Sequence, residues 1–341
     1  MHSFLVLYRF FAFLVFTTFS FLVFSQSRFR LMEYNVENLF DVFHDSLKAD
    51  QEFLPGTVRN WTKPRFWKKL IHISQVISSA ADDQLPDVIM LCEVENDSVL
   101  LYLTRRSPLR VAGYDYYMTH SPDERGIDIA FLYQKATFKP LKFDEIEIDR
   151  SAIGNRPTRN ILHVEGITQT RDTLDLFLCH FPSRSRGQSI SDPYRRHVAQ
   201  VLKQHVDSVM AHKSKPRIII TGDFNDFPDN ASLKTVLKAS KVEDEINPLS
   251  LYNLLIGKKP GTYKYKGKWN TLDHFIVNGN LLYKQSGHFY TAPEWVKIHQ
   301  PSFILEEDLK YGGLKPFRTY NGLRYQGGYS DHLPVVADFH W

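Results

Sequence analysis

The sequence predicts an α/β layered fold, because strand-like and helix-like segments alternate along most of the chain. Apolar runs rich in β-forming residues recur, and several are nearly continuous, as expected for strands covered on both faces. The runs are residues 29–34, 87–92, 127–133, 174–179, 217–220, 272–277 and 334–339. Helical patterns lie between them, and this alternation is typical of layered α/β proteins.

Two helices are predicted from apolar residues at helical spacing. The first follows Pro64, which suits the first turn of a helix. The second follows Asp192-Pro193. The apolar faces are Phe66, Leu70, Ile73, Ile77 and Ala80 in the first helix, and Val198, Val201, Leu202, Val206 and Val209 in the second.

No repeat or Pro/Ser-rich linker divides residues 26–341, so we expect one domain there. The least regular stretch, residues 292–328, is predicted to be a long loop. Residues 1–25 contain a short apolar run that ends in small residues, which is typical of a cleaved signal peptide. The alternative is an uncleaved anchor, because the run is close to the shortest that spans a bilayer. We expect a secreted or periplasmic monomer with no stable membrane anchor after cleavage.

The composition excludes an extensively disordered chain. The 341 residues are 43% hydrophobic and 14% aromatic, enough for a sizeable core. The formal net charge is +4, and loss of Arg9 with residues 1–25 would leave 4 − 1 = +3, which permits a polyanionic partner without indicating one. Cys92 and Cys179 are too few for a disulfide framework, and we expect both to be buried free thiols rather than a disulfide or a nucleophile.

Polar groups stand where apolar strands end. Glu93 ends the run 87–92, and Asn35 follows the run 29–34, with Glu37 and Asn38 close behind. Carboxylate and amide oxygens at such places suit a hard ion such as Mg²⁺ or Mn²⁺. Glu93 could instead be a strand-end acid paired with a basic side chain, and Asn35 only a turn residue.

Asp223 and Asn225 stand two residues apart after another apolar strand, which places both on one side of an extended segment. One could accept a proton while the other holds a phosphate oxygen or water. An Asx-type turn is the alternative reading.

His180 and His332 adjoin apolar strands, where histidine can be structural or can protonate a leaving group when a carboxylate holds its other nitrogen. Asp331 is adjacent to His332 and points away from it in a strand, so Asp273 is the better candidate for that role.

Together these segments resemble the endonuclease/exonuclease/phosphatase superfamily, metal-dependent phosphoesterases that include deoxyribonuclease I, abasic-site endonucleases, sphingomyelinases and inositol-polyphosphate phosphatases. The matching segments are residues 34–40, 91–96, 178–183, 222–226, 272–274 and 330–334, in the family's order. The resemblance implies a four-layer α/β/β/α sandwich like deoxyribonuclease I, with the site at one edge of two packed sheets.

The resemblance also implies roles for the candidate residues. It assigns Glu93 to the metal ion, with Asn35 and Glu37 beside it and Asp331 as a further metal or water ligand. It makes Asp223 and Asn225 the pair of residues that binds the attacking water and the phosphate. It makes His332, held by Asp273, an acid or a phosphate clamp. It fits His180 to subfamilies with a second site histidine. Asp128 is either an acid behind the ligands or a plain strand residue.

The substrate is less constrained. Arg184 and Arg186 follow His180, and Arg195, Arg196 and His197 come soon after, so these groups could follow a nucleic-acid backbone or form a solvated charged face. Aromatic and basic residues in 292–328 could stack on bases or pack that loop onto the domain. These residues are Tyr311, Phe317, Arg318, Tyr320, Arg324 and Tyr325.

Three functions are compatible with these residues. The leading hypothesis is an exported, metal-dependent endonuclease acting on DNA or RNA. The alternative is a phosphoesterase for lipid head groups or small phosphorylated metabolites. A catalytically inactive binding module is disfavoured, because every catalytic position carries a chemically competent residue.

Overall fold

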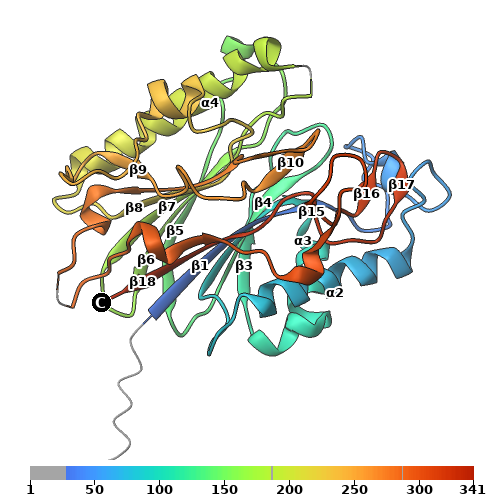
Figure 1. Cartoon of the computed structure of the whole chain (residues 1–341), viewed down its shortest axis with the longest axis horizontal. Helices are drawn as coiled ribbons and strands as arrows, with labels where there is room; N and C mark the ends of the chain where they lie inside the picture. Colours follow the sequence, from blue (N-terminus) through green and yellow to red (C-terminus); the bar gives the residue numbers. More distant parts are fainter. Residues whose placement is uncertain (1–27, 186, 286) are drawn as a thin grey trace, which may run out of the picture.

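The computed structural model describes residues 28–185, 187–285 and 287–341, and it confirms the predicted α/β sandwich. Two six-stranded sheets lie face to face, with helix α4 over one outer face and helix α2 over the other (Figure 1). The predicted signal peptide, residues 1–25, lies outside the described residues. Within the described part of the chain, no helix has the length and apolarity needed to cross a membrane.

The first sheet has the strand order β13-β18-β1-β2-β4-β3. Its strands are β1 (Arg28–Leu39), β2 (Val88–Val94), β3 (Asp115–Met118), β4 (Asp128–Tyr133), β13 (Val296–Ile298) and β18 (Val335–His340). Strands β1 and β2 are parallel, whereas β1 and β18 are antiparallel. The sheet thus joins segments from the two ends of the described chain.

The second sheet has the order β5-β6-β7-β8-β12-β9. Its strands are β5 (Phe138–Ile146), β6 (Ile161–Thr168), β7 (Thr173–His180), β8 (Ile218–Asp223), β9 (Leu251–Asn253) and β12 (Asp273–Asn278). Strands β7 and β8 run parallel, and β12 runs antiparallel to β8. Their register places His180 and Asp273 on either side of Asp223.

The helices cover the outer faces because each has one apolar side. Helix α2 (Lys63–Ser79) has Pro in its first turn as predicted, whereas α4 (Gln188–His212) begins one turn earlier than predicted. The residues of that extra turn are polar except for Ile190, which is exposed, so they gave no periodic signal. The third helix, α3 (Asp97–Leu101), is short and is capped by Asn96, whose side chain accepts a hydrogen bond from the Val99 amide.

The segment 292–328 is more regular than predicted. It contributes β13 to the first sheet and contains two small ladders, β14 (Leu305–Glu307) with β15 (Leu314–Pro316), and β16 (Tyr320–Asn321) with β17 (Arg324–Tyr325). Most of its aromatic side chains serve packing; Tyr320, for example, is buried against Trp61. The remaining paired strands, β10 (Tyr263–Tyr265) and β11 (Lys268–Asn270), form a separate hairpin.

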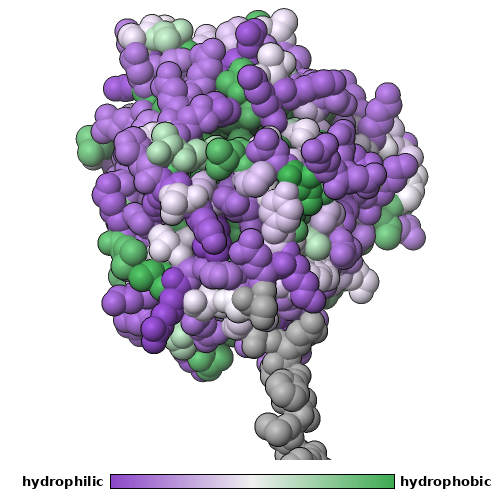
Figure 2. All heavy atoms as spheres, turned by 90° about the vertical axis from the view of Figure 1, so that its left-hand side faces the viewer, coloured by the Kyte–Doolittle hydropathy of each residue, from purple (hydrophilic) through white to green (hydrophobic). Residues whose placement is uncertain are grey.

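Both cysteines are buried free thiols, as predicted. Cys92 belongs to the large core that residues of both sheets form, and Cys179 to the core under α4. The face drawn in Figure 2 is mainly hydrophilic, with small separate hydrophobic areas. The apolar residues of the chain are thus used mainly between the layers.

Candidate active site

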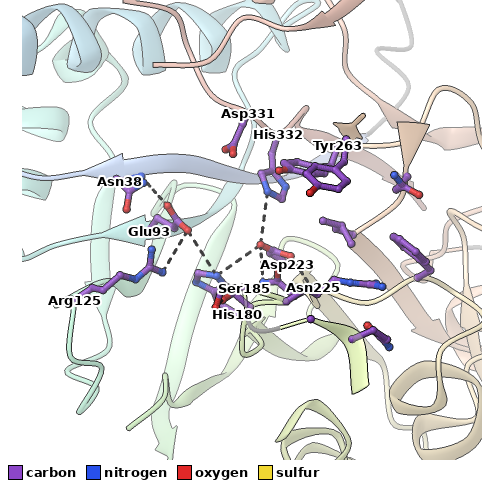
Figure 3. A pocket seen from close by; sticks show the side chains of 18 residues that line it. Asn38, Glu93, Arg125, His180, Ser185, Asp223, Asn225, Tyr263, Asp331 and His332 are labelled. Atoms are coloured by element: carbon purple, nitrogen blue, oxygen red, sulfur yellow. Dashed lines mark hydrogen bonds and ion pairs between the residues drawn. The ribbon is translucent and has the colours of Figure 1, made fainter. Parts of the chain in front are cut away.

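Most of the predicted polar groups line one cavity of about 580 Å³ at an edge of the two sheets (Figure 3). They are Glu93, His180, Asp223, Asn225, Asp331 and His332. Asn35 reaches this edge on β1 and Asp223 reaches it on β8. The Asn35 side-chain nitrogen donates a 3.1 Å hydrogen bond to Asp223 Oδ2. The first and second sheets are therefore joined by a polar contact directly beneath the cavity.

Asp223 is held in place on several sides. The Asn225 backbone amide donates to Asp223 Oδ1 at 2.8 Å, and the Asn225 side chain donates to Asp223 Oδ2 at 3.2 Å. The turn predicted as an alternative is thus present, and both residues still line the cavity. The preceding Gly222 has φ +139°, and a Cβ there would lie 1.9 Å from the Cys179 carbonyl oxygen. Only glycine permits this close approach of β8 to β7.

His332 and Asp273 form the predicted pair. Nδ1 of His332 lies 2.8 Å from Asp273 Oδ2, and both residues are buried. The other ring nitrogen, Nε2, lies 3.9 Å from Asp223 Oδ2 and is directed into the cavity beside Tyr263 (Figure 3). One carboxylate therefore orients the ring, and the opposite nitrogen faces the site.

The charges of this group are set by burial and by the neighbouring carboxylates. Burial alone would lower the pKa of His332, but Asp273 and Asp223 outweigh it and raise that pKa well above its ordinary value. Burial raises the pKa of Asp223 to about 7, while His332 opposes the rise. At neutral pH His332 thus carries a proton that it can donate, and Asp223 is poised to accept one.

His180 differs from His332. Its Nε2 lies 3.6 Å from Asp223 Oδ2 and 3.9 Å from Glu93 Oε1, and its Nδ1 has no hydrogen-bond partner among the described residues. Burial and the nearby guanidinium groups of Arg159 and Arg125 lower its pKa well below the ordinary value. His180 is therefore neutral, so it suits hydrogen bonding to phosphate or water rather than transfer of a proton from a charged imidazolium ring.

Glu93 and Asn38 place oxygen atoms side by side at the cavity wall (Figure 3). The Asn38 amide donates to Glu93 Oε2 at 2.8 Å. The Asn38 side-chain oxygen is buried and has no hydrogen-bond partner in the described part of the chain. Glu93 has φ +68° at a register shift in β2, which aims its side chain out of the strand's alternation. An unsatisfied amide oxygen next to a carboxylate fits a hard cation.

Two predicted metal ligands have other partners. Both Glu37 carboxylate oxygens accept hydrogen bonds from the late segment, from Thr319 N at 2.6 Å and Tyr320 N at 3.2 Å, and Glu37 does not line the cavity. Asp331 does line it, but its carboxylate accepts a 2.8 Å hydrogen bond from Arg318. Glu37 thus anchors the late segment, and Asp331 is the nearer of the two to a possible ion.

Asp223, Asp273 and His332 also form a set of potential metal-ligand atoms within 4.8 Å of one another. In this set, however, His332 Nδ1 is already engaged by Asp273, and its raised pKa favours the protonated ring, which cannot bind a metal. This chemistry favours proton transfer at that cluster and metal binding at Glu93 and Asn38.

The predicted arginines lie in different environments. Arg184 lines the cavity, but its guanidinium lies 4.2 Å from the Phe227 ring centre and 3.7 Å from Asp226. Arg195 is fully buried, with its Nε 2.8 Å from Asp226, so it cannot belong to a nucleic-acid-binding face. Arg186 lies outside the described residues.

Asp128 does not line the cavity. Its carboxylate accepts hydrogen bonds from the Thr119 hydroxyl and the Ser121 backbone amide, and so stabilises a turn away from the cavity.

Sequence reasoning missed two residues that shape the site. Arg159 is buried and donates to the carbonyl oxygens of His180 and Phe181, which fixes the end of β7. Tyr263 packs against the His332 ring with centroids 5.0 Å apart. Neither follows an apolar strand in the sequence, so the signal used for the others could not reveal them.

His274, next to Asp273, is structural and should make stability pH-dependent. The Asn253 amide donates to its Nδ1, and its Nε2 lies 2.9 Å from the Asp226 carbonyl, so the buried ring is neutral. Burial lowers its pKa to about 4, below the unfolded value of 6.5. Between these two pH values the ring is protonated in the unfolded state but not in the folded state. The free energy of unfolding therefore falls as the pH falls from about 6.5 towards 4.

We expect thermal unfolding followed by circular dichroism to show this effect. Acidification from pH 7 to 5 should cost the wild type about 2 kcal/mol more than a His274→Gln variant, whose amide can keep both hydrogen bonds. Other buried groups titrate equally in both proteins, so they cancel. Identical pH dependence of the two melting temperatures would show that His274 is not held neutral.

The fold and site together define a phosphoesterase. The family model described as "Endonuclease/Exonuclease/phosphatase family" matches residues 30–340. The chain belongs to that family. A search of curated proteins found no match.

Solved structures share the fold at low sequence identity. Truncated TDP2 from Caenorhabditis elegans has a TM-score of 0.53 and 16% identity, covering 92% of this chain and 98% of that one. A mannosyl-6-phosphatase from Bacteroides thetaiotaomicron has a TM-score of 0.56 and 14% identity, covering 92% and 100%. TDP2 from D. rerio, complexed with single-strand DNA product, has a TM-score of 0.55 and 13% identity, covering 92% and 100%. At such identities these likenesses establish the fold alone.

Proposed function

We propose that the protein is a divalent-metal-dependent phosphodiesterase whose substrate is a polynucleotide. The proposed reaction is supported by one observation: His332, Asp223 and Glu93 all line the same cavity. A proton acceptor, a proton donor and an oxygen-rich corner are the parts that hydrolysis of a phosphodiester requires.

The proposed chemistry uses the chain's own groups as follows. Asp223 accepts a proton from water as the water oxygen bonds to phosphorus. His332, held by Asp273, donates a proton from Nε2 to the oxygen that leaves when its bond to phosphorus breaks. Asn225 and neutral His180 orient the phosphate by hydrogen bonds. Glu93 and Asn38 would hold the ion, with Asp331 and Asn35 beside them, and a bound Mg²⁺ or Mn²⁺ would neutralise the non-bridging oxygens.

The polynucleotide part of the proposal is supported by the cavity wall. Among the described residues, the Arg125 guanidinium has one ion-pair contact, at 3.7 Å from Glu93. The exposed Tyr265 and the ring of Phe227 also line the cavity. Guanidinium groups bind phosphate oxygens, and aromatic rings stack on bases. The D. rerio relative with bound single-strand DNA supports this choice of substrate.

A small phosphoester is the second candidate. It is favoured because the Arg184 guanidinium already contacts Asp226 and the Phe227 ring. Fewer arginine side chains are therefore free to bind the phosphates of a nucleic-acid strand than the sequence suggests. The mannosyl-6-phosphatase relative belongs to this class. We also propose export with removal of residues 1–25, which N-terminal sequencing of the protein recovered outside the cytoplasm would test.

A substrate panel tests the proposed function. Purified protein should cleave plasmid DNA, single-stranded DNA or RNA in Mg²⁺ or Mn²⁺, lose that activity in EDTA, and regain it when the ion is restored. Sphingomyelin, phosphoinositides and mannose 6-phosphate serve as the competing substrates. Activity on one of these alone would overturn the nuclease proposal and keep the phosphoesterase chemistry, whereas unchanged turnover in EDTA would overturn metal dependence.

A further inference from the structure

A second, smaller cavity of about 260 Å³ adjoins the candidate active site. The two cavities share Arg125, Ser183 and Ser185 in their walls. The smaller one is also lined by Tyr194 of α4 and by residues of the segment that precedes β6, between 153 and 159. The smaller cavity is therefore next to the catalytic one, within reach of a substrate that extends beyond the group that reacts.

The smaller cavity has unsatisfied hydrogen-bond donors in its wall. Nη1 of Arg156 and Oγ1 of Thr158 are both buried, and neither has a hydrogen-bond partner among the described residues. Arg156 is instead supported by the Tyr194 ring, 5.3 Å from its guanidinium carbon, and Thr158 is only 4% exposed. Buried donors without partners are uncommon and costly, so an acceptor is expected to complete them.

The charge of the cavity favours an anion. Three guanidinium groups line it (Arg125, Arg156, Arg159), against the carboxylates of Asp123 and Glu124. Asp123 is already committed, because it accepts a 2.9 Å hydrogen bond from Arg159 and another from the Arg125 amide. Glu124 is exposed to solvent. The uncommitted charges facing a ligand are thus mainly those of Arg156 and Arg125.

We propose that this cavity is a binding subsite for a second phosphoryl group of the substrate, one that is not cleaved. The proposal deepens the proposed function and rests on it for the identity of the substrate. The bound group is either the next diester of a polynucleotide strand or a terminal phosphate monoester. Arg156 and Thr158 supply its hydrogen bonds, and Arg125 lies between it and the phosphate that reacts.

Direct anion binding tests the subsite independently of catalysis. Calorimetry with inorganic phosphate in EDTA should show one binding site in the wild type. Arg156→Gln should weaken it about tenfold or more and Thr158→Val less, since each removes a hydrogen bond to a charged group. Arg196→Gln, which removes an equal charge from the exposed face of α4, is the matched control and should bind as the wild type does.

Kinetics with three chromogenic diesters test its use by the enzyme. Bis(p-nitrophenyl) phosphate has no second phosphate, thymidine 3′-phosphate 5′-(p-nitrophenyl phosphate) adds a monoester, and the 5′-p-nitrophenyl phosphate of the dinucleotide TpT adds a diester. Arg156→Gln should raise KM about tenfold for one or both phosphate-bearing esters and leave the first unchanged. The ester with the larger change identifies the natural group as a monoester or a chain diester.

The two assays separate the possible failures. Phosphate binding that survives Arg156→Gln and Thr158→Val but disappears in His332→Ala would place the anion in the catalytic cavity and overturn the subsite. Equal KM changes on all three esters would also overturn it. If the wild type hydrolyses none of the esters in Mg²⁺ yet phosphate binding depends on Arg156, the proposed function fails and the anion site stands.

Discussion

Glu93→Gln is expected to lower phosphodiester turnover by about a hundredfold or more, because a cation at a scissile phosphate is worth several kcal/mol of charge stabilisation. The substitution keeps the shape of the side chain and its hydrogen bond from the Asn38 amide, so the fold should survive. Initial rates at several Mg²⁺ concentrations measure the effect, and circular dichroism verifies the fold.

Glu95→Gln is the matched control for Glu93→Gln. Glu95 lies two residues further on, accepts a hydrogen bond from the Asp41 amide and does not line the cavity. Burial raises its pKa to about 8, so it is mostly protonated at neutral pH and its replacement removes little charge. Normal turnover of Glu93→Gln at saturating Mg²⁺ would exclude Glu93 from ion binding.

His332→Ala is expected to lower turnover by about a hundredfold to ten-thousandfold, the usual contribution of a positioned acid. Asp273→Asn should damage the same step, because Asp273 orients the ring and raises its pKa. Groups that act as a unit are not additive, so the double variant should be little worse than the worse single variant. Turnover numbers of the four proteins at saturating substrate give this comparison.

The double variant and a diester with a good leaving group test the pairing of Asp273 with His332 and the role of His332 as the acid. Fully multiplicative losses in the double variant would show that Asp273 acts on another group, of which the nearest candidate is Asp223. Retention of turnover in His332→Ala on a diester with a good leaving group such as p-nitrophenol, together with loss on DNA, would instead support His332 as the acid, since that leaving group needs no proton.

The buried strands could be predicted because their sequences are nearly continuous apolar runs. Strands β1, β2, β4, β7, β8, β12 and β18 were all found at the expected places. Strands β5 and β6 were missed because polar and exposed residues interrupt them; β5 is exposed at Lys139, Leu141 and Lys142. A half-exposed strand at the sheet edge has a weaker pattern than one covered on both faces.

The site was predictable where a side chain acts at the end of its own strand. Asn35, Glu93, His180, Asp223 and His332 all meet as expected. Glu37 was not, since its partners, Thr319 and Tyr320, are more than 280 residues away in the sequence. Contacts that depend on such tertiary placement leave no local pattern.

The motifs themselves mix catalytic and structural residues, which spacing cannot separate. Asp226 follows Asp223 and Asn225 in its motif, yet it is buried. Its carboxylate pairs with Arg195 of α4 and accepts a hydrogen bond from the Ser232 hydroxyl. His274 follows Asp273 and holds the Asp226 carbonyl. These two residues fix the backbone from which Asp223 and Asp273 project, and only their burial reveals this role.

The position of β18 between β13 and β1 makes the first sheet and the candidate site depend on one segment. His332 lies three residues before the start of β18, and β18 covers an edge of β1, the strand that carries Asn35. A chain that lacks the segment from His332 to the end of β18 would therefore lose both the histidine that faces the cavity and the strand that lies between β1 and β13. The same short segment thus decides whether the first sheet is continuous and whether Asp273 has its histidine partner.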